Sequence, residues 1–263
     1  MGTLIVEEQT EVKTEIKQGS AKTDEVSIVV LLVKNPAFAA DKAYQINILG
    51  KSMKEWVTGA CEGYRVQTAE YGLEDNVAET VKPILTNSKY TVVLYSDTPL
   101  LKPQTLKEII DYALTKKASV VKLTRGYVFE TDFIRRAENI YTAEPHYFDE
   151  EDFIAAFGLK QLSMIESIMK TRILNYHMKS GVRILDLDSV TIEADVTIEK
   201  GTVIHPNNRL YGTCYIGFNV ELLPNNYIKN SIIEDYSKIL YSVVENSKIP
   251  PNSRVGPFEK VVH

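Results

Sequence analysis

An aliphatic residue recurs at every sixth position over a long stretch of this chain. The run is Ile192, Ile198, Ile204, Leu210, Ile216, Leu222 and Ile228. A period of six fits neither an α-helix, which repeats every 3.6 residues, nor a simple strand, which repeats every two. It fits a triangular coil with faces of about six residues, in which one inward side chain per face builds a continuous core. The C-terminal third is therefore predicted to be a β-helix of hexapeptide repeats.

A second column of mostly small residues lies two positions before each member of the first. It comprises Val190, Val196, Thr202, Asn208, Cys214, Val220 and Asn226. We expect these residues at tight corners, where Asn tolerates a left-handed backbone better than most residues do. After Ile228 the phase slips, which predicts modified turns within a coil that continues. The expected later rungs are Ile233, Ile239, Val243, Ile249, Val255 and Val261.

The first half of the chain has a different pattern. Val26–Val33 and Thr91–Tyr95 are continuous apolar runs, typical of strands that are buried on both faces of a parallel sheet. Amphipathic helices are predicted at Lys51–Cys61 and, after Pro103, at Gln104–Leu114. Strands that alternate with helices indicate an α/β layer. Further short strands are expected at Val120–Leu123 and Tyr127–Phe129, and a long helix at Leu159–Lys179 that ends at Gly181.

Composition excludes several classes of protein. The net charge of −5 over 263 residues gives no basic field for nucleic acid or an anionic membrane. The longest apolar run is far below the roughly 20 residues of a membrane span, and no signal peptide is visible. Cys61 and Cys214 form no metal-ligand spacing and are expected to be reduced, partly buried thiols. These features predict a cytoplasmic protein.

Several phrases together resemble one enzyme family. They are TVVLYSDTPLLKPQTL at Thr91–Leu106, GKSMKEW at Gly50–Trp56, and QLSMIESIMKTRILNYHMKSGVRILDLDSVTIEADVTIEKGTVIHPNNRLYGTCYIG with NSRVGPF within Gln161–Pro257. This set is similar to the bifunctional bacterial N-acetylglucosamine-1-phosphate uridyltransferase / glucosamine-1-phosphate acetyltransferases. The resemblance implies a tail or peripheral strand (1–25), a shortened nucleotidyltransferase-like, Rossmann-like parallel-sheet domain (26–158), a linker helix (159–183) and a left-handed parallel β-helix (184–263).

The resemblance also implies a binding site. Tyr95, Ser96 and Asp97 match the family's Y-G-D motif, and Gly72 is kept from its uridine-contacting segment. These four residues are the predicted nucleotide-binding residues. Asp97 is also the predicted ligand of Mg²⁺, the cofactor expected if the protein is active. The implied partners are a nucleotide or sugar nucleotide and, as in the family, further copies of the chain in a trimer.

Other positions depart from the family. Its glycine-rich phosphate loop corresponds to Lys34–Lys42, and no glycine occurs between Gly19 and Gly50. Pro36 removes a backbone donor where donors are needed. Lys160 stands at the position of the second metal ligand, and we expect it to compete for Asp97. Thr124 stands where the family has an asparagine.

Three hypotheses about the function stay open. The first is a catalytically degenerate relative, a pseudoenzyme that binds a nucleotide or sugar nucleotide or serves as an assembly module. The second is an active Mg²⁺-dependent sugar-1-phosphate nucleotidyltransferase of the UDP-N-acetylglucosamine diphosphorylase type. The third is a hexapeptide-repeat acyltransferase, although His205 has no partner residues at a useful spacing and the family's later coils are not expected here.

Overall fold

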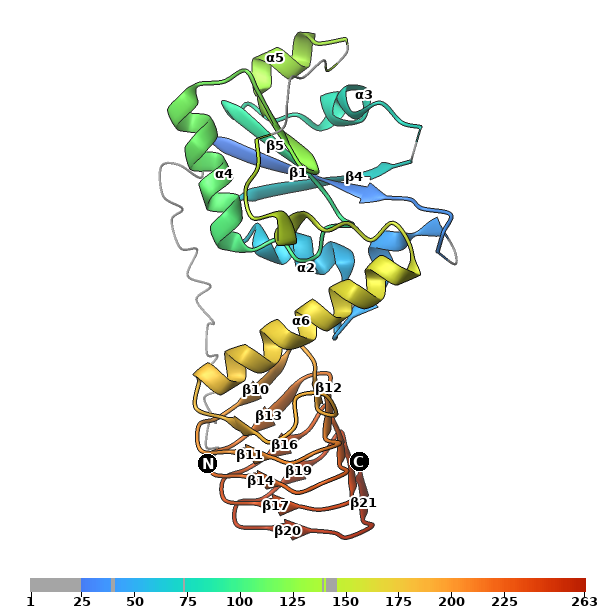
Figure 1. Ribbon diagram of the computed structural model, residues 1–263, viewed down its shortest axis with the longest axis vertical. Helices are drawn as coiled ribbons and strands as arrows, with labels where there is room; N and C mark the ends of the chain where they lie inside the picture. The colour runs from blue at the N-terminus through green and yellow to red at the C-terminus, as the bar shows by residue number, and fades with distance from the viewer. Residues whose placement is uncertain (1–24, 39–40, 73, 139, 141–145) are drawn as a thin grey trace, which may run out of the picture.

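The molecule has an α/β half and a coiled β half, with one long helix between them (Figure 1). This computed structural model describes residues 25–38, 41–72, 74–138, 140 and 146–263. The predicted tail or peripheral strand therefore lies outside the described residues except for Glu25. No helix within the described ranges is long and apolar enough to cross a membrane.

Five strands of the α/β half form one mixed sheet in the order β4-β1-β5-β7-β6. Their bounds are β1 Val26–Val33, β4 Arg65–Tyr71, β5 Tyr90–Tyr95, β6 Val120–Leu123 and β7 Gly126–Glu130. Strands β1, β4 and β5 are parallel, as expected, but β7 is antiparallel to β5 and β6. The predicted parallel-sheet fold is confirmed for β4, β1 and β5, whereas the antiparallel pairing at this edge was not predicted. Only Thr124 and Arg125 link β6 to β7, and a parallel connection needs about a dozen residues or more.

Helices cover both faces of this sheet (Figure 1). Ile28, Val30 and Leu32 of β1 share one core with α2 (Met53–Ala60) and α4 (Pro103–Lys116). The alternate residues of β1, which are Val29, Leu31 and Val33, share a second core with α3 (Val77–Val81) and α5 (Thr131–Arg136). Burial on both faces explains why β1 is an uninterrupted apolar run.

Short elements complete the α/β half. They are the 3₁₀ turns η2 (Ala43–Gln45), η3 (Lys82–Ile84) and η4 (Glu150–Phe153) and the hairpin strands β2 (Asn47–Ile48) and β3 (Lys51–Ser52). The long helix α6 spans Leu159–Lys179, as predicted, and Gly181 follows it with a φ of +93°. Glycine adopts this backbone conformation at no steric cost, which ends the helix cleanly.

The hexads form the predicted left-handed parallel β-helix, whose three parallel sheets stack coil upon coil (Figure 1). One sheet contains β8 (Arg183–Ile184), β11 (Val203–Ile204), β14 (Glu221–Leu222), β17 (Lys238–Ile239) and β20 (Arg254–Val255). A second contains β9 (Thr191–Ile192), β12 (Arg209–Tyr211), β15 (Tyr227–Lys229), β18 (Val243–Glu245) and β21 (Lys260–Val262). The third contains β10 (Val196–Ile198), β13 (Cys214–Ile216), β16 (Ile232–Ile233) and β19 (Lys248–Ile249).

The aliphatic ladder is the core of the β-helix. All seven residues of the unbroken run are buried in one cluster. One later rung was predicted wrongly, because Val244 is fully buried whereas Val243 is only half-buried. The step from Ile239 to Val244 is therefore five residues, one shorter than the period of six and one longer than the predicted step to Val243.

The small-residue column does not form the left-handed corners. Asn208 and Asn226 are buried, and the Asn226 amide donates to the Asn208 carboxamide oxygen at 2.9 Å. The left-handed positions are instead the residues directly before them, Asn207 (φ +60°) and Asn225 (φ +64°). The expected tolerance of Asn for this conformation is confirmed, but one residue earlier in each coil.

The two halves are in direct contact. The Ala194 amide of the β-helix donates to the Leu49 carbonyl at 2.9 Å, and Lys51 pairs with Asp195 at 3.0 Å. Ile165 and Met169 of α6 are buried with residues of the α/β half, including Ile48, Met53 and Leu100. Helix α6 therefore packs directly against the α/β half through a shared apolar core. The domain boundaries themselves stay a prediction.

Candidate functional site at the carboxyl edge of the sheet

The order of the strands identifies one edge of the sheet as a place for a ligand. From β1 the chain passes through α2 to β4 on one side, then through α3 to β5 on the other side of β1. In open α/β sheets, ligands bind outside the carboxyl ends of the strands where the strand order reverses in this way. We call the residues gathered there the carboxyl-edge cluster: Asn35, Tyr95, Asp97, Arg125 and Phe157.

Asp97 and Arg125 form the centre of the cluster. Arg125 Nε donates to Asp97 Oδ1 at 2.7 Å, and Arg125 Nη2 donates to Oδ2 at 2.5 Å. Asp97 is 1% exposed, while the Arg125 side chain retains 21% exposure. Burial raises the pKa of the Asp97 carboxyl, and the two hydrogen bonds from Arg125 act against that rise. Since the guanidinium is always charged, this bidentate pair favours an ionised Asp97.

Aromatic rings hold the guanidinium in place. The Arg125 Cζ atom lies 4.3 Å from the ring centroid of Tyr95 and 5.0 Å from that of Phe157. Tyr95 in turn meets Tyr71, the last residue of β4, edge-on at 5.5 Å. Cation–π contacts add to the two hydrogen bonds, so the position of Arg125 is strongly determined.

The loop after β1 turns its backbone donors inward. The Asn35 amide donates to the Asp41 carbonyl, the Phe38 amide to the Asn35 carbonyl, and the Asp41 amide to the Phe38 carbonyl. The Ala37 amide donates to Asn35 Oδ1 at 2.9 Å, and the Asn35 side-chain amide reaches the Phe157 carbonyl at 3.2 Å. A phosphate cradle needs free backbone N–H groups. The N–H groups of Asn35, Ala37, Phe38 and Asp41 already have acceptors within the protein.

The four predicted nucleotide-binding residues all lie at this edge, in different settings. Gly72 follows β4, and its amide donates to Asp75 Oδ2 at 2.6 Å. Tyr95 lies beneath the guanidinium of Arg125. Ser96 is fully buried, and its hydroxyl accepts from the Val33 amide at 2.9 Å, which ties β5 to β1. Binding of a nucleotide by these residues stays a prediction.

The partner of Asp97 was predicted wrongly. Lys160 is exposed at the start of α6, and Arg125 is the residue that bonds both oxygens of Asp97. Arg125 was missed because it is separated from Asp97 by 28 positions in the sequence. The available signal was its place between two short strands, directly after Thr124. Had those strands been read as a hairpin beside β5, Arg125 would have been expected near the end of β5.

Lys34 is also engaged. It pairs with Glu70 at 2.6 Å at the carboxyl end of the neighbouring strand β4. Hydrogen bonding to Glu70 raises the pKa of Lys34, and the same contact lowers the pKa of Glu70. Both side chains are substantially exposed, so the pair contributes little to stability. It does reduce the positive charge that Lys34 offers to a phosphate.

Comparison with known proteins gives relatives for part of the chain. It is 39% identical over 113 residues to the bifunctional protein GlmU of Caldanaerobacter subterraneus subsp. tengcongensis, a match that covers 43% of this chain and 25% of the relative. The values for the bifunctional protein GlmU of Rippkaea orientalis are 36% over 113 residues, 42% and 25%. Those for the protein of the same name from Clostridium botulinum are 41% over 110 residues, 42% and 24%. No family model matches the chain.

Over 42–43% of its length the chain is similar to the bifunctional GlmU proteins. The match spans about a quarter of the length of these curated relatives. The resemblance predicted from the sequence phrases is therefore confirmed at the level of the family relationship.

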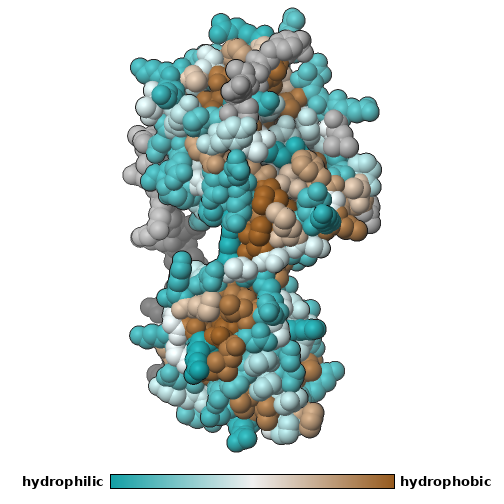
Figure 2. Space-filling model, in the orientation of Figure 1, coloured by the Kyte–Doolittle hydropathy of each residue, from teal (hydrophilic) through white to brown (hydrophobic). Residues whose placement is uncertain are grey.

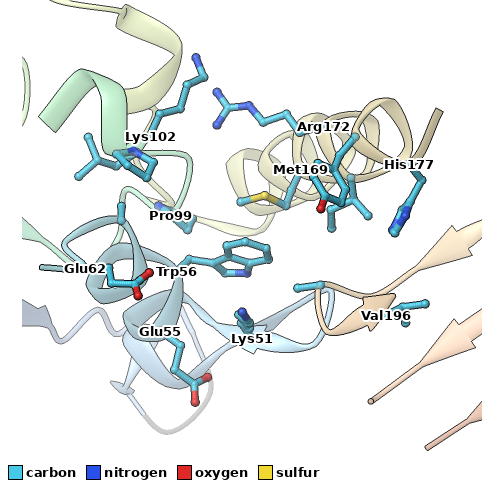
Figure 3. Close-up of a pocket in the computed structure, with 17 residues that line it drawn as sticks. Lys51, Glu55, Trp56, Glu62, Pro99, Lys102, Met169, Arg172, His177 and Val196 are labelled. Atoms are coloured by element: carbon cyan, nitrogen blue, oxygen red, sulfur yellow. The ribbon is translucent and has the colours of Figure 1, made fainter. Parts of the chain in front are cut away.

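The protein also has a groove at the waist between its halves. This groove, of about 490 Å³, is lined by α2, α6 and the first coil of the β-helix. Figure 3 shows Trp56 between these elements, with Met169 on the opposite wall and Lys102 and Arg172 at one side. Figure 2 shows apolar surface on both sides of this waist. Both cations already have carboxylate partners, because Lys102 and Arg172 each pair with Asp152 at 2.9 Å.

The histidines and cysteines of the GlmU relative do not form a catalytic constellation among the described residues. His205 pairs with Glu221 at 3.4 Å, and Lys238 shares the same carboxylate at 2.7 Å. Cys61 and Cys214 are free and buried, as expected. Burial raises the pKa of Cys61 to about 12, which keeps this thiol protonated and unreactive at neutral pH.

Proposed function

We propose that this chain is a GlmU-related protein that binds a nucleotide or sugar nucleotide at the carboxyl-edge cluster and does not catalyse nucleotidyl transfer. One observation carries the proposal: both oxygens of Asp97 accept hydrogen bonds from Arg125. Nucleotidyl transfer proceeds by in-line displacement at a phosphate, and divalent cations normally spread the developing charge. Asp97 would have to give up a bidentate, charge-assisted pair before it could ligate such a cation.

The loop after β1 supports the same proposal. Phosphate-binding loops present several backbone N–H groups to one anion. In this chain Pro36 has no N–H group, and the backbone N–H groups of Asn35, Ala37 and Phe38 already donate to acceptors within the loop. This loop therefore offers few free backbone donors to a triphosphate. A ligand with fewer phosphate groups would require fewer such donors.

Turnover is the direct test. The protein is incubated with UTP, N-acetylglucosamine 1-phosphate and Mg²⁺, and pyrophosphate release is followed, with one of the full-length GlmU relatives as a positive control. We expect no release above the enzyme-free blank. Robust turnover would overturn the proposal and favour an active, divergent nucleotidyltransferase. A parallel arm with acetyl-CoA and glucosamine 1-phosphate tests acyl transfer, and no free thiol is expected.

Binding is tested separately by thermal shift. A ligand that binds only the native state raises the midpoint of unfolding. We expect UDP-N-acetylglucosamine to raise it and N-acetylglucosamine alone to leave it unchanged. If no nucleotide or sugar nucleotide raises the midpoint, the binding part of the proposal fails, and an assembly role is left as the remaining form of the non-catalytic protein.

Assembly through the β-helix is a second candidate, favoured by aromatic exposure on its later coils. Tyr241 is 43% exposed and Phe258 is 83% exposed, and their rings lie 5.8 Å apart. Neighbouring exposed apolar side chains are typical of contact surfaces. We expect light scattering to show a trimer, and a Phe258→Ser/Tyr241→Ser variant to dissociate it. A monomeric mass for the unmodified protein would contradict this role.

A further inference from the structure

Arg125 has a combination of features that a purely structural arginine does not need. Two of its N–H groups are used by Asp97, and no acceptor for the other three is found among the described residues. The guanidinium lies between the rings of Tyr95 and Phe157 and is still 21% exposed. It is thus a positive charge with spare donors, held rigidly at the carboxyl ends of the strands.

The residues of this cluster do not fit Mg²⁺. The ion prefers carboxylate, phosphate and water oxygens in octahedral geometry, usually with one or two protein carboxylates. Asp97 is the carboxylate of the cluster, and Arg125 bonds both of its oxygens. No group of three or more His, Cys, Asp or Glu residues able to hold a metal ion occurs within the described part of the chain. A metal ion would have to displace a guanidinium that two hydrogen bonds and two rings hold in place.

We propose that Arg125 takes the place of a divalent cation at Asp97, so that the cluster binds the phosphate of a nucleotide or sugar nucleotide without a metal ion. This inference rests on the proposed ligand binding. One edge of the guanidinium bonds Asp97, and its remaining N–H groups bond phosphate oxygens, an arrangement that the planar fork of arginine permits and lysine does not.

The decisive measurement needs no variant. UDP-N-acetylglucosamine is titrated calorimetrically into the full chain, once with EDTA and once with Mg²⁺. We expect the two dissociation constants to agree within about a factor of two, since no ion takes part. Uridine and N-acetylglucosamine serve as phosphate-free controls and should bind at least roughly tenfold more weakly, because the charge-assisted bonds to phosphate are missing. Binding that appears only with Mg²⁺ would overturn the inference.

Variants then test Arg125 itself. The double variant Asp97→Asn/Arg125→Gln removes both charges and avoids an unpaired buried carboxylate. We expect it to fold, as judged by circular dichroism, and to bind the sugar nucleotide roughly tenfold or more weakly with or without Mg²⁺. Arg135→Gln is the matched control, because Arg135 bonds the Thr86 carbonyl and the Asn87 side chain just before β5, at the opposite end of the sheet. Its affinity should equal that of the unmodified protein.

The outcomes separate this inference from the proposed function. Wild-type affinity of the double variant in EDTA would overturn the role of Arg125. Absence of binding under every condition would overturn the inference together with the ligand-binding part of the proposed function. Failure of the non-catalytic proposal has its own signature, which is pyrophosphate release, and that result does not depend on any of these titrations.

Discussion

Among the described residues of the α/β half two aspartates are buried, Asp97 and Asp152, and each is bonded to an arginine. Asp152 is fully buried in η4 and accepts from four donors, which are the Lys102 amide, Lys102 Nζ, Thr105 Oγ1 and Arg172 Nη2. These donors come from the start of α4 and from α6. Within the described part of the chain Asp97 has one side-chain partner, Arg125, which is partly exposed and has further N–H groups for which no acceptor is found there.

A structural buried charge and one that can act on a ligand differ in how their partners are satisfied. The oxygens of Asp152 are satisfied from several elements, and its bonds to the Lys102 amide and Thr105 cap the first turn of α4. The pair at Asp97 is satisfied on the carboxylate side and open on the guanidinium side. We therefore call Asp152 and its donors Lys102, Thr105 and Arg172 the clamp, because they hold α4, α6 and η4 together. We call Asp97 and Arg125 the site, because the guanidinium can still bind a ligand. The predictions below test that contrast.

The largest effect is expected at the clamp. Asp152→Ala should lower the free energy of unfolding by about 4 kcal/mol, since removal of one partner leaves buried charge and cap donors without an acceptor. Urea denaturation measures this value. Asp149→Ala is the control, because Asp149 is exposed, pairs with Lys102 and accepts from the Glu151 amide at 3.1 Å, and loss of this surface pair and cap should cost about 1 kcal/mol. Equal costs for the two variants would remove the distinction between clamp and surface pair.

A substitution in the β6–β7 hairpin, which carries Arg125, should lower the free energy of unfolding nearly as much. Gly126 has a φ of +136°, and an added Cβ would lie 2.6 Å from the Val93 carbonyl oxygen of β5. Gly126→Ala should cost about 3 kcal/mol or more through backbone strain and displacement of the hairpin. It should also weaken binding of UDP-N-acetylglucosamine.

A matched glycine at the same edge provides the control for that variant. Gly72 has no positive φ, and its nearest contact to an added Cβ is the Asp75 carboxylate at 3.4 Å. Gly72→Ala should therefore change the free energy of unfolding by no more than about 0.5 kcal/mol. A large loss at Gly72, or none at Gly126, would show that this edge is held differently.

Removal of the site carboxylate should cost less than removal of the clamp carboxylate. Asp97→Ala should lower the free energy of unfolding by about 2 kcal/mol, because the hydrogen bonds of Arg125 are lost while its exposed face is still hydrated. The measurement is urea denaturation in parallel with Asp152→Ala. A cost at Asp97 as large as that at Asp152 would mean that both carboxylates act as clamps.

The smallest effect concerns pH at the helix that carries Arg172. His177 of α6 is buried, and burial lowers its pKa below the ordinary value. The unfolded chain then binds a proton more readily than the folded protein as the pH falls below about 6.5, so His177 lowers stability from there down to its folded pKa. His177→Gln should flatten this part of the stability profile. His205→Gln, at a histidine that is paired with Glu221, should leave the contribution of His177 in place.

Much of the fold could be predicted from local pattern. The seven-residue aliphatic ladder, the bounds of α6 and the glycine after it all follow from spacing and backbone preference alone. Errors arose where distant segments meet. The strands around Thr124 joined the sheet as an antiparallel hairpin, and Val244 replaced Val243 after a slip that no local signal measures.

The site could be predicted only in part, for the same reason. The motif at Tyr95–Asp97 predicted which edge of the sheet carries the candidate site. It did not predict that Arg125 bonds Asp97 there. The acidic run Asp149–Asp152 gives no local sign of burial in the sequence. It forms η4, in which Asp152 is completely buried. Burial of one acid in a run of four depends on which cations pack against it, and these come from α4 and α6.

The β-helix follows from the order of residues alone, because each rung of six residues repeats the same local geometry and buries its aliphatic side chain against its neighbours. That order also determined the family relationship, which rests on phrases read along the chain. Only the tertiary structure decided which cation meets Asp97. That contact depends on the antiparallel pairing of β7 with β5, which brings Arg125 to a carboxylate 28 positions away. Contacts at such separations depend on how whole elements pack, and the residues on either side of Asp97 do not indicate which cation will meet it.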